Sequence, residues 1–132
     1  MERDTRQRRA IRGVLEKSGN PLSTREVLVA AHRHAPTLGV ATVYRNLKAL
    51  VEEGWLKAVE LPGEPTRYEP AGLRHHHHFR CRGCARIFDL KGDRKRDLKG
   101  CRPPGARAPK GFVVESHEIL VYGRCASCAG AA

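Results

Sequence analysis

The sequence predicts an α+β protein in which three helices and a hairpin precede a domain of short strands. Two observations support this fold class. Apolar residues recur at helical spacing in the first half, whereas β-branched and aromatic residues cluster after residue 75. The change of pattern predicts a first domain over 1–70, a hinge over 71–74 and a second domain over 75–132. We expect the second domain to be a small α/β unit with a three-stranded sheet.

Each predicted helix has its own start or stop signal. Apolar residues repeat at helical spacing over 10–15, and the sequence "SGNP" at 18–21 ends this first helix. Ser23 and Glu26 have the spacing of a capping box, which opens a second helix that ends near "HAPTLG". A third helix begins near Val40 and ends at the glycine of "EEGW".

The third helix is followed by "WLKAVEL" and "TRYEP", which flank the turn "PGEP" and predict a two-stranded hairpin. Three helices and a hairpin form a winged helix-turn-helix, and the outer face of the third helix is small, aromatic and cationic. The alternative is a plain three-helix bundle with a solvated face. The candidate DNA-contacting residues are Arg8, Thr42, Tyr44, Arg45 and Lys48.

Charge and composition restrict the partners. The formal net charge of +11 over 132 residues favours a polyanion such as double-stranded DNA. The N-terminus lacks the apolar segment of an export signal, and no run of about 18 apolar residues could span a membrane. We therefore expect a cytoplasmic protein with no membrane partner. Four of its five cysteines form two CxxC pairs, which are then better explained as metal ligands than as disulfides.

Two CxxC pairs give the strongest signal of metal binding: Cys81 with Cys84, and Cys125 with Cys128. Each pair can present two sulfurs to one ion, and two pairs complete a tetrahedral zinc shell. The alternative is a redox dithiol. The 40 residues between the pairs exceed ordinary zinc-ribbon spacing, so we expect them at the ends of different strands. Cys101 is interpreted as an incidental thiol in the basic, Pro- and Gly-rich segment 91–111, where a short helix is predicted near 93–99.

Four consecutive histidines, 75–78, lead into the first CxxC pair. A purification tag is disfavoured because the run is internal, and a solvated polar loop is the remaining simple explanation. If the run is a strand, successive side chains point to opposite faces. His75 and His77 would then share one face, and His76 and His78 the other. The four cannot all bind one ion.

Several of these segments together resemble the ferric uptake regulator superfamily of metal-responsive repressors. The segments are "TRQR" at 5–8, "GVATVYRNLKAL" at 39–50, "RYE" at 67–69, "HHHHFRCRGC" at 75–84 and "SHEILVYGRC" at 116–125 with its closing CxxC. The resemblance covers nearly the whole chain. It implies an N-terminal winged-helix DNA-binding domain and a C-terminal α/β dimerisation domain.

The resemblance also implies three metal sites. A structural zinc would be held by the four paired cysteines, and a regulatory ion would lie at the hinge. A further site would lie in the dimerisation domain. The implied ligands are Cys81, Cys84, Cys125 and Cys128 for the structural zinc, Glu69, His76, His78 and Asp89 for the regulatory ion, and His75, His77 and His117 for the further site.

Two positions depart from the family pattern. The family usually supplies a regulatory histidine where this chain has Asn20-Pro21, and His32 and His34 are poor substitutes. An acidic ligand of the further site is replaced by Arg96, although Asp93 or Asp97 could shift in. The regulatory donors are nitrogen and oxygen only, which suit Fe(II) or Mn(II) but also permit Zn(II). Zinc-responsive relatives often carry a cysteine where this chain has Ala71, which favours iron or manganese.

The resemblance thus implies a homodimeric, metal-dependent repressor of metal-uptake genes that binds a pseudo-palindromic operator. A zinc-uptake regulator and a peroxide-sensing regulator of the same fold are alternatives. A zinc hydrolase is a third class of hypothesis, but the sequence has no HExxH motif and no evident general base. We therefore expect neither enzymatic activity nor a small organic substrate.

Overall fold

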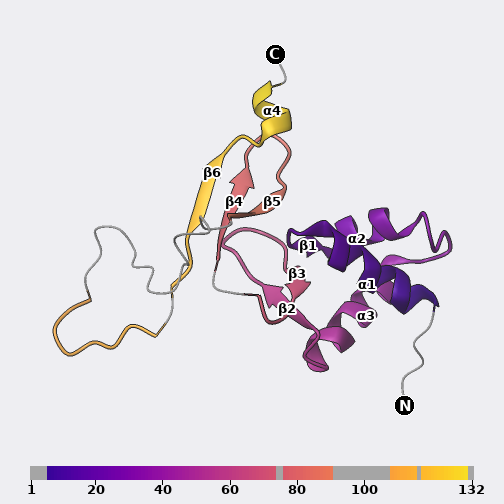
Figure 1. Cartoon of the computed structure of the whole chain (residues 1–132), viewed down its shortest axis with the longest axis horizontal. Helices are drawn as coiled ribbons and strands as arrows, with labels where there is room; N and C mark the ends of the chain where they lie inside the picture. The colour runs from indigo at the N-terminus through magenta and orange to yellow at the C-terminus, as the bar shows by residue number, and fades with distance from the viewer. Residues whose placement is uncertain (1–5, 74–75, 91–107, 116, 131–132) are drawn as a thin grey trace. The chain divides into compact units, whose positions relative to one another are not determined.

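The computed structural model describes residues 6–73, 76–90, 108–115 and 117–130. The chain forms two compact units, Met1–Leu73 and Arg74–Ala132, which are described separately below. Figure 1 shows the helices α1 to α3 with strands β1 to β3 in the first unit, and strands β4 to β6 with α4 in the second. No helix in the described part is long and apolar enough to cross a membrane.

Three helices make up most of the first unit: α1 (Arg6–Ser18), α2 (Thr24–Ala31) and α3 (Val40–Glu52). The capping box is confirmed, because the Ser23 hydroxyl accepts from the Glu26 N–H while the Glu26 carboxylate accepts from the Ser23 N–H. The end of α3 is also as expected. Gly54 has a φ of 81°, and its N–H donates to the Val51 carbonyl, so the chain leaves the helix in a left-handed turn.

The expected hairpin is confirmed as β2 (Leu56–Val59) and β3 (Arg67–Pro70), which pair antiparallel. A short strand that the sequence analysis did not predict, β1 (Leu22–Ser23), pairs with the other edge of β3 and gives the order β1-β3-β2. Because β1 immediately precedes α2, this pairing joins the wing to the start of the helix-turn-helix.

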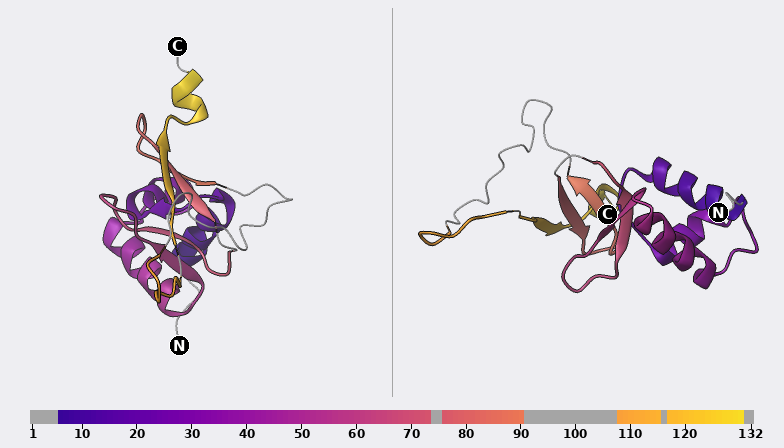
Figure 2. Two further views of the ribbon diagram at one scale, coloured as in Figure 1. Left: turned by 90° about the vertical axis from the view of Figure 1, so that its left-hand side faces the viewer. Right: turned by 90° about the horizontal axis from the view of Figure 1, so that it is seen from below.

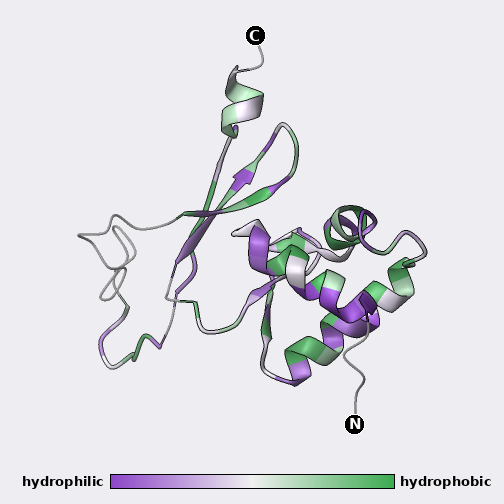
Figure 3. Cartoon of the chain, turned by 45° about the vertical axis from the view of Figure 1, so that its right-hand side comes forward, coloured by the Kyte–Doolittle hydropathy of each residue, from purple (hydrophilic) through white to green (hydrophobic). Residues whose placement is uncertain are grey.

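The core of the first unit is built from the apolar stripes of its three helices. These stripes face each other, while polar residues cover the outside, as the alternation of colours along the helices shows (Figure 3). Leu47, in the middle of α3, is completely buried. The other members are Ile11, Leu15, Val27, Ala31, Ala35, Leu38, Val43, Leu50, Leu56 and Tyr68.

The second unit contains the three-stranded sheet that was predicted. Its order is β5-β4-β6, with β4 (His77–Cys81) in the centre. It pairs antiparallel with β5 (Ile87–Leu90) and parallel with β6 (Leu120–Gly123). The short helix α4 (Ala126–Gly130) follows β6 at one end of the sheet, as the further views in Figure 2 also show.

The β-branched and aromatic run over 112–125 forms a strand only at Leu120–Gly123. Phe112, Val113 and Val114 are instead exposed and have no regular structure. Their β propensity has no partner strand within the described chain, and a strand needs hydrogen-bonded neighbours to form. The helix predicted near 93–99, most of the segment 91–111 and Cys101 lie outside the described residues.

Candidate metal centres and nucleic-acid interface

The sulfur atoms of Cys81, Cys84, Cys125 and Cys128 lie within 4.8 Å of one another. The Cys84 and Cys125 sulfurs are 3.9 Å apart. In a tetrahedral Zn–S₄ shell with bonds of about 2.3 Å, the sulfurs are separated by about 3.8 Å. The four donors are soft thiolates with the number and spacing that structural zinc requires, so the cluster fits a zinc ion.

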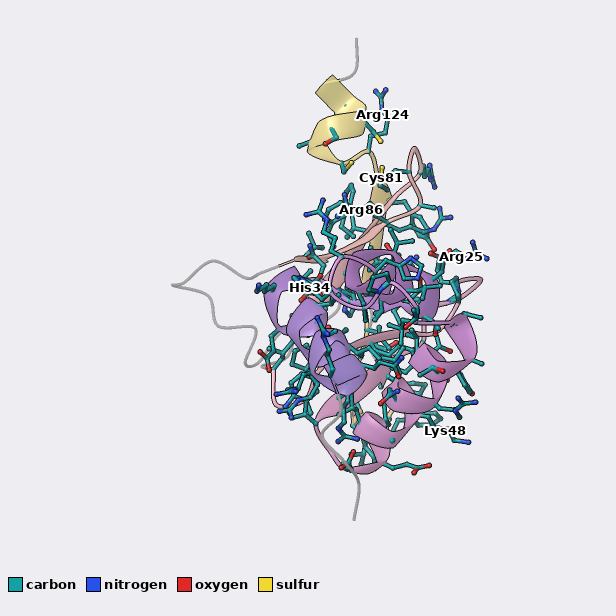
Figure 4. The ribbon with its side chains drawn as sticks, turned by 90° about the vertical axis from the view of Figure 1, so that its right-hand side faces the viewer. Arg25, His34, Lys48, Cys81, Arg86 and Arg124 are labelled. Carbon is teal, nitrogen blue, oxygen red and sulfur yellow. The ribbon has the colours of Figure 1, made fainter. Side chains whose placement is uncertain are left out.

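The parallel pairing of β4 with β6 explains why cysteines so distant in sequence meet. Cys81 ends β4 and is paired with Gly123 of β6. Because parallel strands end at the same edge of a sheet, Cys125, two residues after β6, emerges beside Cys81. Cys84 lies in the turn between β4 and β5, and Cys128 is carried by α4. Figure 4 labels Cys81 and Arg124 at this end of the sheet.

Backbone N–H groups surround the Cys81 sulfur. The N–H groups of Cys125 and Cys84 donate to it at 3.2 Å and 3.4 Å. These two hydrogen bonds favour the thiolate and lower the pKa of Cys81 to about 6. The Cys128 thiol donates to the sulfurs of Cys81 and Cys125, which raises its pKa to about 12. A cation that binds all four sulfurs as thiolates would therefore have to displace protons from the cluster.

Gly83 has a close packing role that the sequence analysis did not identify. A Cβ atom at this position would lie 2.8 Å from the Cys128 sulfur and 3.0 Å from the Cys128 Cβ. Only glycine leaves room for α4 to bring Cys128 against the turn between β4 and β5. A glycine inside a CxxC pair is the only sequence signal for this role.

A second donor cluster lies at β4 and β5 of the same unit. The register pairs His78 with Asp89, and the ring of His76 lies 4.9 Å from that of His78. The Nε2 atoms of both histidines are 3.4 Å from Asp89 Oδ1. His78 is buried and Asp89 is partly buried. Two imidazoles and a carboxylate in this arrangement offer the nitrogen and oxygen donors that bind Fe(II), Mn(II) or Zn(II).

Glu69, the fourth expected regulatory ligand, lies in β3 of the first unit and is buried with 3% of its surface exposed. Asn20 lies in the turn after α1, where its N–H donates to the Ser18 hydroxyl, and Pro21 is completely buried. His32 is also occupied within the first unit, because its Nε2 lies 3.0 Å from the Leu38 carbonyl oxygen.

The opposite face of β4 carries His77. Its Nε2 lies 3.1 Å from the Nε2 of His117, and the two rings are 5.2 Å apart. Two nitrogens at this distance can act as neighbouring ligands of one ion. His75, Asp93, Arg96 and Asp97 lie outside the described residues. Successive histidines of β4 thus lie on opposite faces, as the period of a strand requires.

The outer face of α3 is accessible in the first unit. Tyr44, Arg45 and Lys48 are exposed, and Lys48 points away from the helix in Figure 4. Arg45 Nη2 donates to the Thr42 hydroxyl at 3.2 Å, which orients the guanidinium on the helix surface. The buried stripe Val43, Leu47 and Leu50 fixes the opposite face against the core. The helix is therefore positioned as a recognition helix should be.

Arg8 is placed differently from the α3 residues. Its Nη2 forms an ion pair with Glu53 Oε2 at 2.5 Å, which joins the start of α1 to the C-terminal cap of α3. The side chain of Arg8 is only 12% exposed. A phosphate contact by Arg8 would therefore require exchange of this carboxylate partner for DNA.

The sequence model of the Ferric uptake regulator family matches residues 2–122. The chain belongs to this family. It is 28% identical over 130 residues to the ferric uptake regulation protein of Bacillus subtilis, covering 96% of this chain and 85% of that protein. It is 29% identical over 126 residues to the zinc uptake regulation protein of Mycobacterium tuberculosis, covering 96% and 94% of the two chains.

Among solved structures, the Helicobacter pylori ferric uptake regulator aligns with a TM-score of 0.65 at 25% identity, over 98% of this chain and 83% of that one. That protein is described as having three functional metal-binding sites. Family members are metal-responsive transcription regulators with a DNA-binding winged helix. The present chain has the same fold and two clusters that can hold metal ions.

Proposed function

We propose that the protein is a homodimeric, metal-dependent repressor of metal-uptake genes that acts in the cytoplasm and is not an enzyme. The observation that carries the proposal is the cluster of His76, His78 and Asp89, which begins two residues after the predicted hinge. The same chain exposes the outer face of α3, the proposed recognition helix. Metal-controlled DNA binding needs a cluster of metal-binding side chains and a DNA-binding surface in the same chain.

We place Glu69 as the fourth regulatory ligand. Only six residues, 70–75, separate it from His76, and the seven Cα–Cα steps between the two residues span at most about 25 Å when extended. An ion that binds Glu69 together with the histidines would tie the end of the wing to the second unit. Binding of the ion would then select one arrangement of the two units from the ensemble available to the free protein.

In the proposed dimer the selected arrangement sets the distance between two recognition helices. A two-fold symmetric pair of helices matches a pseudo-palindromic operator only when its half-site spacing is correct. Tyr44 would contact bases, and Arg45 and Lys48 would contact mainly phosphates. We propose a structural zinc at the four cysteines, which would hold the ends of β4 and β6 together with α4. The His77 and His117 pair, with His75, would supply part of a further site.

We favour Mn(II) or Fe(II) as the regulatory ion, because the proposed donors are two imidazole nitrogens and two carboxylates, without a thiolate. A zinc-uptake regulator remains the second candidate. The similarity to the zinc uptake regulation protein of M. tuberculosis is the specific observation in its favour. A peroxide-sensing regulator would be distinguished by oxidation of His76 or His78 after peroxide treatment, detected by mass spectrometry.

The test starts from the full-length protein with intact structural zinc. Sequences are enriched from a random duplex library with Mn(II), with Zn(II), or with Fe(II) under anaerobic conditions, and affinity for the enriched duplex is then measured with and without each ion. We expect the ion to tighten binding at least about tenfold, the range of ordinary allosteric coupling. Equal affinity with and without every ion would contradict the metal-switch mechanism.

A matched pair of variants tests the site itself. His76→Ala removes a proposed regulatory ligand, whereas His34→Ala removes an exposed histidine of the first unit. We expect His76→Ala to lose the metal response and His34→Ala to keep it. A full metal response in His76→Ala would show that the regulatory ion binds elsewhere.

A further inference from the structure

Arg67, in the central strand of the wing sheet, is a buried cation between two carboxylates. Its side chain is 5% exposed. Nη1 forms an ion pair with Glu26 Oε1, and Nη2 lies 3.6 Å from Glu64 Oε1. Burying a charge is costly unless it is paired, so both contacts are needed to offset desolvation of the guanidinium. The arrangement therefore fixes three segments of the chain relative to one another.

One of these segments is the start of α2. The Glu26 oxygen that contacts Arg67 also accepts the Ser23 N–H at 3.0 Å, within the capping box. The register of the sheet pairs Ser23 with Arg67 as well. Arg67 is thus attached to the first helix of the helix-turn-helix through both its backbone and its side chain.

The second segment is the tip of the wing. The Glu64 N–H donates to the Leu61 carbonyl at 3.1 Å, and Gly63 has a φ of 72°, so the segment 61–64 is a tight turn with Pro62 at its second position. Such a turn is rigid in itself. The contact between Glu64 and Arg67 then fixes the direction in which the turn extends from the sheet.

The contact also changes the charge that the wing presents. The Glu64 side chain is only 7% exposed, so its negative charge is screened by Arg67 and turned away from solvent. Lys57 on β2 and Glu60 after it are exposed. A wing whose second acidic residue is buried beside a cation presents less negative charge to a polyanion.

We propose that Arg67 is a positioning residue for DNA binding. It holds the wing turn 61–64 against the N-terminal end of α2, so that wing and recognition helix meet the DNA as one body, and it keeps the Glu64 carboxylate away from the phosphates. This inference rests on the proposed DNA-binding function.

The test compares two substitutions that remove the same charge from the same wing. Glu64→Gln is nearly isosteric and removes the negative charge that pairs with Arg67, whereas Glu60→Gln removes the charge of an exposed carboxylate. The full-length, Mn(II)-loaded proteins bind the duplex enriched by the wild type, at several KCl concentrations and well below the unfolding temperature of each variant. Removal of a negative charge alone favours DNA binding, so Glu60→Gln should bind as tightly as wild type or more tightly.

We expect Glu64→Gln to bind about fivefold more weakly than Glu60→Gln, the effect of losing one ion pair. The plot of log affinity against log salt concentration should also become less steep by about one unit, which corresponds to the loss of one phosphate contact. The reason is that the wing would no longer be held in a fixed position against the DNA. Arg67→Lys keeps the positive charge but lacks the planar guanidinium with its two donor groups. Its affinity for the duplex should therefore lie between those of the wild type and Glu64→Gln.

Two results would overturn the inference. Equal affinity and salt slope for Glu64→Gln and Glu60→Gln, together with specific binding by the wild type, would show that the ion pairs only stabilise the fold. In that case thermal unfolding alone would distinguish the variants. Absence of any enriched sequence for the wild type with all three metals would instead remove the proposed function and this positioning role together.

Discussion

Replacing Gly83 with alanine should weaken the cysteine site selectively. The added Cβ would lie 2.8 Å from the Cys128 sulfur, whereas ordinary contacts begin at about 3.5 Å. The sulfur would have to move by about 0.7 Å. Zinc–ligand distances tolerate only about 0.2 Å of change, and the Cys128 Cβ is also too close, at 3.0 Å, for the side chain simply to rotate away.

We expect Gly83→Ala to lose about 10- to 100-fold in zinc affinity, the range for disturbance of groups that orient metal ligands. The control is Gly130→Ala, two residues after Cys128, where an added Cβ meets nothing within 4 Å. Alanine should if anything stabilise α4 there, by about 0.5–1 kcal/mol. The opposite signs expected for the two variants separate a steric effect at the sulfur from a general effect of the substitution.

Zinc content is measured by mass spectrometry of the purified proteins, and affinity by competition with a chromophoric chelator. The second unit of Gly83→Ala should also unfold at lower chelator concentration than that of Gly130→Ala. Equal zinc affinity for wild type, Gly83→Ala and Gly130→Ala would refute the reasoning, because it would mean that α4 is not held against the turn by the metal.

Three further results are expected. Gly123→Ala would place a Cβ 2.9 Å from the Phe79 ring. We therefore expect the free energy of unfolding of the second unit, measured in urea, to fall by about 1–3 kcal/mol. An unchanged free energy of unfolding would mean that the ring can move aside. Leu47→Ala empties a fully buried position in the first unit and should cost about 2–5 kcal/mol, measured in the same way. Burial, followed by the nearby Tyr44, raises the pKa of Tyr68, so its contribution to stability is complete below pH 10 and is lost as pH rises through the folded-state pKa. Absorbance titration of the phenolate should show this late step in wild type and not in Tyr68→Phe.

The sequence was informative wherever a local signal had a local cause. The capping box at Ser23 and Glu26 and the glycine stop at Gly54 are set by residues within one helical turn, and both were found as expected. Strand propensity was less reliable. The run over 112–125 has the composition of a strand throughout, but only Leu120–Gly123 has a neighbour to pair with in the described chain.

The candidate metal residues show the same division. Strand alternation alone separated His77 from His78, because a period of two needs no tertiary information. The expectation that the CxxC pairs lie at different strand ends also came from spacing. That β4 and β6 run parallel, which is what brings Cys125 to Cys81, could not be read from the sequence, since the choice of neighbour and direction depends on the whole sheet.

The sequence by itself determined the types of donor, the capping box of α2, the glycine stop of α3 and the opposite faces of His77 and His78, because these depend on side-chain chemistry and short periodicities. Tertiary structure alone revealed the contacts of Gly83 and Arg67. Nothing in the sequence marks either residue strongly, since a glycine inside a CxxC pair and an arginine in a strand are both ordinary. Their roles come from neighbours 45 and 41 positions away, Cys128 and Glu26, and only the folded chain brings these atoms together.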